Sequence, residues 1–372
     1  MSLELIDEWG PEKIVCVSDG RTGMRGVLVI DNTARGVGKG GTRMQPDVTV
    51  EEVARLARVM TWKWAAVDLF FGGAKAGIRF DPHSPDKERA LRAFVRALSN
   101  EVPSEYVFGL DMGLTEDDAA VIQDELGDRG ASVGTPRELG GVPYDQWGVT
   151  GYGVAEAADA ARSLNGASVV IQGFGAVGAA AAQRVVALGG TVVAVSSSLG
   201  GTYDPDGLDV DALLAARAEH GDAGVAGTLR PGDELDVQAD VLIPAATQDV
   251  IDVARAESLR FATIVEGANL PIRPDALERL AARGVTVVPD FIANAGGVIA
   301  AAYAMEGRHS PFPIDPDAIF AAVSQKMRAN TATVLEAAET DGVTSHEAAR
   351  TLAADRVRTA MRLKGRIPEY AL

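Results

Sequence analysis

The segment ASVVIQGFGAVG at 167–178 constrains the fold most strongly, because a short apolar strand runs directly into the pattern GxGxxG. The first glycine permits a tight turn, the second lets a pyrophosphate approach the backbone at the start of a helix, and the third allows close helix–strand packing. The flanking strand and alanine-rich helix supply the context that a lone GxGxxG lacks, and a ligand-free turn is the alternative. The residues predicted to contact a dinucleotide here are Gly173, Gly175, Ala176, Val177 and Gly178.

Apolar segments of strand length alternate with helical stretches after this unit. They lie at 191–195, 239–245, 262–268 and 285–290. Such alternation predicts a doubly wound parallel sheet that is covered by helices on both faces.

The N-terminal part of the chain has a different pattern of residues. A strand at 25–31 rises into a glycine-rich turn, and Thr49 with Glu52 three residues later is a capping-box signal for a helix. Another helix is expected across 86–99, and 315–365 is expected to be helical and amphipathic. Glycine and proline accumulate between 127 and 149, which is the candidate domain boundary.

We therefore expect an α/β fold of two domains with a cleft between them, as a length of 372 residues allows. The expected parts are an N-terminal α/β domain (1–147), a Rossmann-type doubly wound NAD(P)-binding domain (148–330), and C-terminal helices (331–372).

Composition excludes several classes of protein. The formal net charge of −17 argues against binding to nucleic acid, which requires basic surface. One cysteine and four dispersed histidines show no ligand spacing, so no metal site is predicted. The acidic N-terminus does not resemble a signal peptide and no apolar run is long enough for a membrane span, so we expect a cytoplasmic protein. Abundant acid with scarce lysine fits either a halophilic host or GC-rich codon usage.

Three of the seven lysines, Lys39, Lys63 and Lys75, lie within 37 residues of one another and beside small residues. Lysine differs from arginine in that crowding by cations or desolvation readily lowers its pKa. The cluster is a candidate site for polarising a carbonyl group and holding carboxylates. Lys63 falls on the apolar stripe of the helix that begins at Thr49, where it either meets an anion or extends to the surface.

The end of the second strand of the doubly wound sheet predicts the nucleotide preference. An acid about 20 residues after the glycine pattern would bind the adenosine ribose. Ser196 and Ser197 occupy that place, and no acid appears until Asp204. We expect NAD or NADP as cofactor, with NADP slightly favoured.

Taken together, the motifs resemble those of the dehydrogenases that act on glutamate, leucine, phenylalanine and valine, from about residue 20 to 365. The motifs, in chain order, are GKGGTRM, MTWKWAA, GGAKAGI, GLDMG, TGYGV, GFGAVG, YDPDGLD, EGAN and NAGGV. The resemblance implies oxidative deamination of an L-amino acid with hydride transfer to NAD(P)⁺. It implies that Lys63 binds the substrate α-carboxylate, that Lys75, in a loop, is the catalytic lysine with a depressed pKa, and that Asp111 shuttles a proton.

The same resemblance implies that Thr150 contacts the nicotinamide carboxamide, and that Asn269 and Asn294 border the nicotinamide ribose and the substrate amine. Asparagines in glycine-rich segments are also common turn formers. Glutamate-type relatives are commonly hexamers and leucine-type relatives octamers, so a homo-oligomer is implied, with a hexamer favoured. The family resemblance also implies that the first domain (1–147) binds the substrate and oligomerises, and that the C-terminal helices (331–372) pack back on it.

Lys39 predicts the substrate within this family. The resemblance implies that a lysine here, beside Gly41, binds a second carboxylate, which favours L-glutamate. Against this, glutamate-type members carry a serine where this chain has Ala301, and the spellings GGTRM and GGAK are closer to the leucine and phenylalanine branch. A leucine-, valine- or phenylalanine-type dehydrogenase is the alternative.

Two further classes are opposed by the sequence. A nucleotide-binding regulatory protein with a dead site does not need Lys63, Lys75 and Asp111 together. A hydroxy-acid or alanine dehydrogenase is opposed by the domain order, because the lysine-rich segment precedes the nucleotide-binding part.

Overall fold

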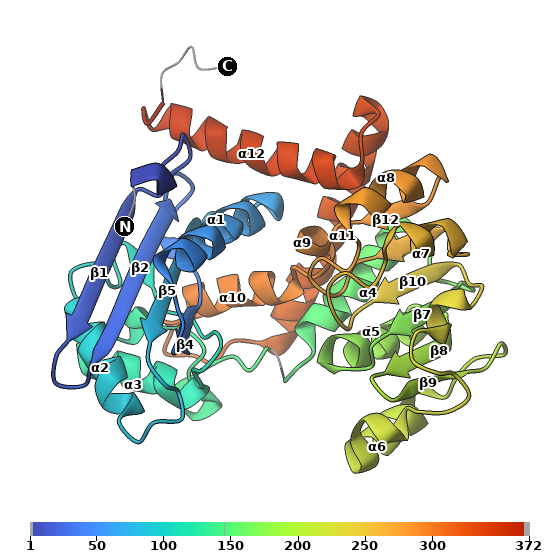
Figure 1. Cartoon of the computed structure of the whole chain (residues 1–372), viewed down its shortest axis with the longest axis horizontal. Coiled ribbons are helices and arrows are strands. Elements are labelled where there is room, and N and C mark those ends of the chain that lie inside the picture. Colours follow the sequence, from blue (N-terminus) through green and yellow to red (C-terminus); the bar gives the residue numbers. More distant parts are fainter. Residues whose placement is uncertain (1–2, 145, 368–372) are drawn as a thin grey trace. The chain divides into compact units, whose positions relative to one another are not determined.

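The computed structural model describes residues 3–144 and 146–367, and the chain forms two compact units (Figure 1). Unit 1 is built from the chain up to Pro143, from 301–315 and from the segment that begins at Ala353; unit 2 is built from 144–300 and 316–352. Residues 1–2, 145 and 368–372 of the predicted domains lie outside the described residues.

Unit 1 contains a mixed sheet with the strand order β1-β2-β5-β3-β6, with β4 paired to β5. β1 and β2 form an antiparallel hairpin, β2 is antiparallel to β5, and β3 and β4 are parallel to β5. The strands are β1 (Lys13–Asp19), β2 (Met24–Asn32), β3 (Gly38–Lys39), β4 (Thr42–Gln45), β5 (Gly72–Arg79) and β6 (Tyr106–Val107).

Both faces of this sheet are covered because its strands alternate apolar side chains between the two sides. On β2, Leu28 and Ile30 pack in the core that contains α2, whereas Val27 and Val29 pack in the core that contains α1. The helices are α1 (Val50–Ala66), α2 (Lys87–Ala97) and α3 (Glu116–Leu126). Thr49 caps α1 by accepting from the backbone N–H of Glu52, which is one half of the predicted capping box, whereas the Glu52 carboxylate accepts from Arg43.

Unit 2 contains the predicted parallel sheet, in the order β12-β11-β10-β7-β8-β9, with β9 as an antiparallel edge strand. Its strands are β7 (Ser168–Gln172), β8 (Thr191–Ser197), β9 (Gly200–Tyr203), β10 (Val241–Pro244), β11 (Thr263–Val265) and β12 (Thr286–Val288). The strand order reverses at β7, which lies between β8 and β10. In such sheets ligands bind beyond the carboxyl ends of the strands at this switch point.

Helices flank the sheet of unit 2. They are α4 (Val149–Ala161), α5 (Ala176–Ala187), α6 (Val210–His220), α7 (Val253–Ser258), α8 (Pro274–Ala282), α9 (Asp290–Ala293) and α11 (Pro316–Asp341). Residues of α7 and α8 enclose one face of the sheet together with Val170, Leu242 and Ile264.

The boundary predicted at 330/331 does not coincide with a break in the structure. α11 continues through it as one helix, because apolar residues such as Val323 and Met327 are buried along its length where it packs on α4. The predicted C-terminal part is divided instead. Residues up to 352 cluster with unit 2, and those from 353 cluster with unit 1.

Two helices belong partly to each unit. They are α10 (Gly296–Gly307) and α12 (Ser345–Leu363), within which the unit boundaries fall at 300/301 and 352/353. Among the described residues, none of the helices combines the length with the apolar character that a membrane span requires.

Candidate active site

Lys75 and Asp111 form an ion pair in unit 1, with 2.5 Å between the lysine Nζ and Oδ2 of the aspartate. Lys75 lies on β5, which is a buried strand and not the loop that the motif suggests. The strand forms because its small residues let α1 lie directly on it: a Cβ on Gly73 would come within 2.0 Å of the Thr61 Oγ1. Asp111 follows the bridge between Thr42 and Leu110, and β4, which carries Thr42, pairs with β5.

Arg43 is a second cation on Asp111. Its Nε and Nη2 atoms lie 3.3 and 3.2 Å from the Asp111 Oδ2, and Nη1 donates to the Glu52 carboxylate. Burial alone would raise the pKa of Asp111, but the charges of Lys75 and Arg43 outweigh it and hold that pKa below its usual range. Asp111 is therefore a carboxylate at neutral pH. The sequence reasoning did not select Arg43, although it lies in the quoted motif GGTRM.

Gly41 keeps the space beside this pair open. A Cβ at this position would lie 3.2 Å from the Lys75 Nζ and 2.9 Å from the Asp111 Cβ. Any larger residue at position 41 would therefore crowd the two ionised groups.

Lys39 is buried on β3 with 3 % of its surface exposed. Its amine donates to the backbone oxygen of Phe108 at 2.9 Å and lies 3.4 Å from that of Val107. Burial, together with the charges of Arg308 and Lys75, lowers the pKa of Lys39 to about 7. The amine can therefore exist in both protonation states near neutral pH.

Lys63 and Ala301 are both half-buried, on α1 and α10 respectively. Lys63 precedes the buried Trp64, whose indole nitrogen donates to the backbone oxygen of Lys39 at 3.1 Å. The last turn of α1 is thus tied to the strand that carries Lys39.

The glycine turn of unit 2 joins β7 to α5 at the switch point of the sheet. Gly173 has φ +92°, and a Cβ there would come within 2.6 Å of the Ala246 Cβ, just beyond β10. A Cβ on Gly178 would come within 1.9 Å of the Gly173 oxygen, so close helix–strand packing requires glycine.

Gly175 differs from these two glycines, because a Cβ on it would meet no atom within 4 Å. It stands at the N-terminus of α5, followed by the exposed Ala176 and the half-buried Val177. The chain therefore leaves room for a phosphate group at a helix N-terminus, which is where a dinucleotide pyrophosphate binds. The residues present fit a dinucleotide.

The two serines predicted to contact the nucleotide differ in their surroundings. Ser196 is buried, and its hydroxyl accepts from the Gly173 N–H at 3.3 Å. The Ser197 hydroxyl is 3.1 Å from the backbone oxygens of both Gly200 and Asp222. Ser196 therefore supports the glycine turn.

Thr150, Asn269 and Asn294 gather in unit 2. The Asn294 side-chain amide donates to the Asn269 side-chain oxygen at 3.0 Å. A Cβ on Gly297 would come within 2.9 Å of the Thr150 hydroxyl, which places the start of α10 directly against the start of α4. Three motifs that are far apart in the sequence, TGYGV, EGAN and NAGGV, thus adjoin one another.

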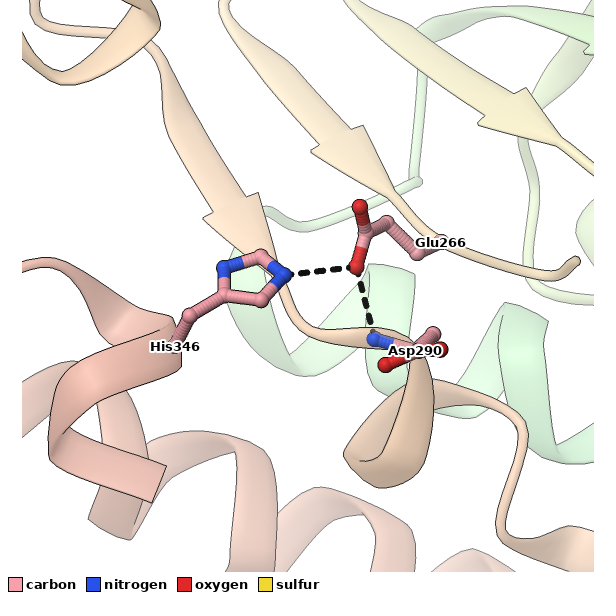
Figure 2. Close-up of side chains that lie close together, drawn as sticks. All are labelled: Glu266, Asp290 and His346. Atoms are coloured by element: carbon pink, nitrogen blue, oxygen red, sulfur yellow. Dashed lines mark hydrogen bonds and ion pairs between the residues drawn. The ribbon is translucent and has the colours of Figure 1, made fainter. Parts of the chain in front are cut away.

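Unit 2 also contains a buried cluster of Glu266, Asp290 and His346 (Figure 2). The Glu266 Oε2 accepts from the backbone N–H of Asp290 and lies 2.8 Å from the His346 Nε2. The Asp290 carboxylate in turn accepts from the backbone N–H of Leu270, next to Asn269. The cluster therefore ties the two loops that carry the asparagines to the first turn of α12.

This cluster also meets the distance criterion for metal ligands, since one ligand atom from each residue lies within 4.8 Å of the others. Its carboxylates are, however, engaged by backbone N–H groups and by His346. The arrangement serves as a hydrogen-bonded anchor, and sequence spacing alone could not reveal it because His346 is 80 residues from Glu266.

Comparison with known proteins gives consistent matches. Residues 11–128 match the model described as the Glu/Leu/Phe/Val dehydrogenase dimerisation domain, and 140–365 match that of glutamate/leucine/phenylalanine/valine dehydrogenase. The chain is 37 % identical to a glutamate dehydrogenase of Thermotoga maritima over 370 residues, which covers 92 % of this chain and 87 % of that one.

Two solved structures extend the comparison. One is the hetero-hexameric glutamate dehydrogenase of Thermus thermophilus in a leucine-bound form, with a TM-score of 0.80, 33 % identity, and coverage of 99 % of this chain and 93 % of that one. The other is the L-tryptophan dehydrogenase of Nostoc punctiforme, with a TM-score of 0.75, 25 % identity, and coverage of 97 % and 100 %.

Proposed function

Because this chain belongs to the glutamate/leucine/phenylalanine/valine dehydrogenase family, we propose that it converts L-glutamate, water and NAD(P)⁺ to 2-oxoglutarate, ammonium and NAD(P)H. The chain is an NAD(P)-dependent amino-acid dehydrogenase. The choice of glutamate is the proposal.

The observation that carries the proposed chemistry is the Lys75–Asp111 ion pair with Arg43 beside it. The Asp111 carboxylate takes a proton from the substrate ammonium group, and Lys75 supports the attacking water and the developing carbonyl oxygen. A dinucleotide held by unit 2 would supply the acceptor for the hydride of the substrate α-carbon. Lys63 pairs with the α-carboxylate.

We propose that residues of unit 2 hold the dinucleotide. Gly173, Gly175 and Gly178 with Ala176 and Val177 hold the pyrophosphate end, as the open position at Gly175 supports. The other contacts come from Thr150, Ser196, Ser197, Asn269 and Asn294. We also propose a homo-oligomer, with a hexamer favoured, which the match to a dimerisation domain supports.

Glutamate is favoured by Lys39, because a buried ammonium group is best stabilised by an anion. Gly41 leaves room beside the catalytic pair for the substrate. The sequence identity of this chain to glutamate dehydrogenases also supports glutamate as the substrate.

A leucine- or phenylalanine-type substrate is the second candidate, and two observations favour it. The Lys39 amine already donates to a backbone oxygen and has a pKa of about 7, so it can be neutral in the working enzyme. Ala301 offers no hydroxyl to a second carboxylate.

A panel of 2-oxo acids with ammonium, run with NADH and NADPH in parallel, tests the substrate. We expect the highest kcat/KM for 2-oxoglutarate. Lys39→Leu should lower kcat/KM for 2-oxoglutarate by about a hundredfold, the scale of losing one partner of a buried charge pair, and affect 2-oxo-4-methylpentanoate far less. Equal losses on both, or a wild-type preference for 2-oxo-4-methylpentanoate, would select the second candidate.

A further inference from the structure

The end of β8 adjoins the glycine turn directly. The Phe174 N–H donates to the Ser196 backbone oxygen at 2.7 Å, and the Gly173 N–H donates to the Ser196 hydroxyl. In dinucleotide-binding sheets the residues that follow this strand face the adenosine ribose. The side chains just after Ser196 therefore stand where the 2′ position of the nucleotide is recognised.

An acidic side chain reaches this place from a distant part of the sequence. The Ser198 hydroxyl donates to the Asp222 Oδ2 at 2.7 Å, and the Ser197 hydroxyl lies 3.1 Å from the Asp222 backbone oxygen. These contacts hold the short 3₁₀ turn Gly221–Gly224 against the end of β8. The acid that is nearer in sequence, Asp204, instead accepts from the backbone N–H of Asp206 in its own turn.

The Asp222 carboxylate is exposed and, within the part of the chain that the structure describes, takes part in no ion pair. An uncompensated carboxylate accepts a hydrogen bond from a ribose 2′-hydroxyl but repels a 2′-phosphate, which carries up to two negative charges. The slight preference for NADP rested on the lack of an acid at the end of this strand, and Asp222 removes that argument.

We propose that Asp222, held by Ser198, is the residue that selects NAD over NADP. The inference rests on the proposed binding of the dinucleotide at the Gly173–Gly178 turn. Neither the glycine pattern nor the serine run reveals it, because Asp222 lies 24 residues after Ser198.

A binding measurement tests this without turnover. Calorimetric titration of the full chain with adenosine 5′-monophosphate and with adenosine 2′,5′-bisphosphate compares nucleotides without and with the 2′-phosphate. We expect the wild type to bind the monophosphate more tightly. Asp222→Asn should tighten binding of the bisphosphate by about tenfold, because one repulsion between close charges is removed.

Glu219→Gln is the matched control. It changes the net charge by the same amount three residues away, on an exposed side chain whose carboxylate lies 3.8 Å from the His220 Nε2. It should leave both affinities within about twofold of the wild type. A wild type that favours the bisphosphate or binds neither nucleotide, or equal effects of Asp222→Asn and Glu219→Gln, would overturn the proposal.

Kinetics separate this inference from the proposed function. We expect Asp222→Asn to lower the ratio of kcat/KM for NADH to that for NADPH by about tenfold. Normal ammonium-dependent turnover with an unchanged ratio would contradict the proposed role of Asp222 but not the proposed function. Selective nucleotide binding without ammonium-dependent turnover on any 2-oxo acid would contradict the proposed function but not the proposed role of Asp222.

Discussion

At the scale of single residues, the proposed chemistry depends on ionised groups that the fold brings together. Lys75 and Asp111 come from segments 36 residues apart, and β5 and the bridge at Leu110 bring them to 2.5 Å. Arg43 adds a second positive charge to the same carboxylate oxygen. The result is an aspartate kept ready to accept a proton at neutral pH.

Asp111→Asn should lower kcat by about two to four orders of magnitude, because the amide keeps the shape of the side chain but cannot accept a proton. Steady-state rates with saturating substrates check this. Asp81→Asn is the control, since Asp81 caps a turn by accepting from the His83 N–H. An Asp111→Asn variant with wild-type kcat would remove Asp111 from the mechanism.

Lys39 should make stability depend on pH. The unfolded chain holds the Lys39 proton up to about pH 10.5, whereas the folded chain releases it near 7. The unfolded state thus binds more protons in this window, so the free energy of unfolding should rise with pH across it, by up to about 5 kcal/mol at about 1.4 kcal/mol per pKa unit.

Urea unfolding followed by tryptophan fluorescence measures this, because Trp9, Trp62 and Trp64 all belong to unit 1. Lys39→Met should abolish the rise. Lys364→Met, at an exposed lysine, should keep it. A Lys39→Met variant with the wild-type slope would show that another group titrates.

At the scale of elements, the glycine turn contains a position, Gly175, at which a substitution should change nucleotide binding but not stability. Gly175→Ala should leave the unfolding temperature unchanged, because the added Cβ meets no atom of the protein. The same Cβ occupies the approach of the pyrophosphate, so the Kd for NADH should rise by about tenfold or more.

Gly20→Ala, where the added Cβ also meets nothing, controls for the loss of backbone freedom. Fluorescence titration with NADH and calorimetric melting measure the two effects. Tight NADH binding by Gly175→Ala would place the dinucleotide elsewhere.

The Glu266–His346 contact anchors the first turn of α12 within unit 2, where Ser345 also donates to the Val287 oxygen at 2.6 Å. His346→Ala should cost about 3 kcal/mol of unfolding free energy at neutral pH, because it leaves a buried carboxylate without its partner. Burial raises the pKa of Glu266 above its ordinary 4.5. Because the folded chain holds this proton more tightly than the unfolded chain, the protonated carboxyl contributes stability. That contribution is fully present below pH 4.5 and is lost as the pH rises through the folded-state pKa.

The destabilisation of His346→Ala should therefore be worse at pH 8 than at pH 5, and Glu266→Gln in the same chain should restore stability at pH 8. Urea unfolding at the two pH values measures both. A double variant no more stable than His346→Ala would show that the Glu266 charge is not the cause.

The elements were more predictable from the sequence than the site. β7, α5 and the alternating strands of unit 2 follow from local apolar patterns, which packing in a parallel sheet reinforces. β3, β4 and β6 are too short to leave a pattern. β3 and β4 exist through pairing with β5, and β6 exists through pairing with β3. The number and spacing of lysines selected Lys39, Lys63 and Lys75 as candidates, but could not show that Lys39 is buried against backbone oxygens.

The residues that sequence reasoning missed act through partners that are distant along the chain. Arg43 is 68 residues from Asp111, and His346 is 80 residues from Glu266. Asp222 reaches Ser198 only because the 3₁₀ turn folds back on β8. No local period encodes such pairs, so only the folded chain reveals them.

At the scale of the whole molecule, a net charge of −17 sets the response to salt. Self-repulsion of the acidic surface opposes the compact state, and added ions screen it. The unfolding temperature should rise from about 0.1 M to about 2 M KCl, as the Debye length falls from about 10 Å to below 3 Å. A flat or falling profile in calorimetry would show that the acidic surface is already compensated.

We propose that the Lys75–Asp111 pair carries reversible amination of a 2-oxo acid. The most direct measurement is the initial rate of NADH and NADPH oxidation with 2-oxoglutarate as ammonium is varied, for the wild type, Lys75→Ala and the exposed-lysine control Lys364→Ala. We predict saturable, ammonium-dependent oxidation in the wild type and in Lys364→Ala, and a loss of about two orders of magnitude or more in Lys75→Ala. Oxidation that is independent of ammonium, or a Lys75→Ala variant with the wild-type rate, would show that the pair does not carry this reaction.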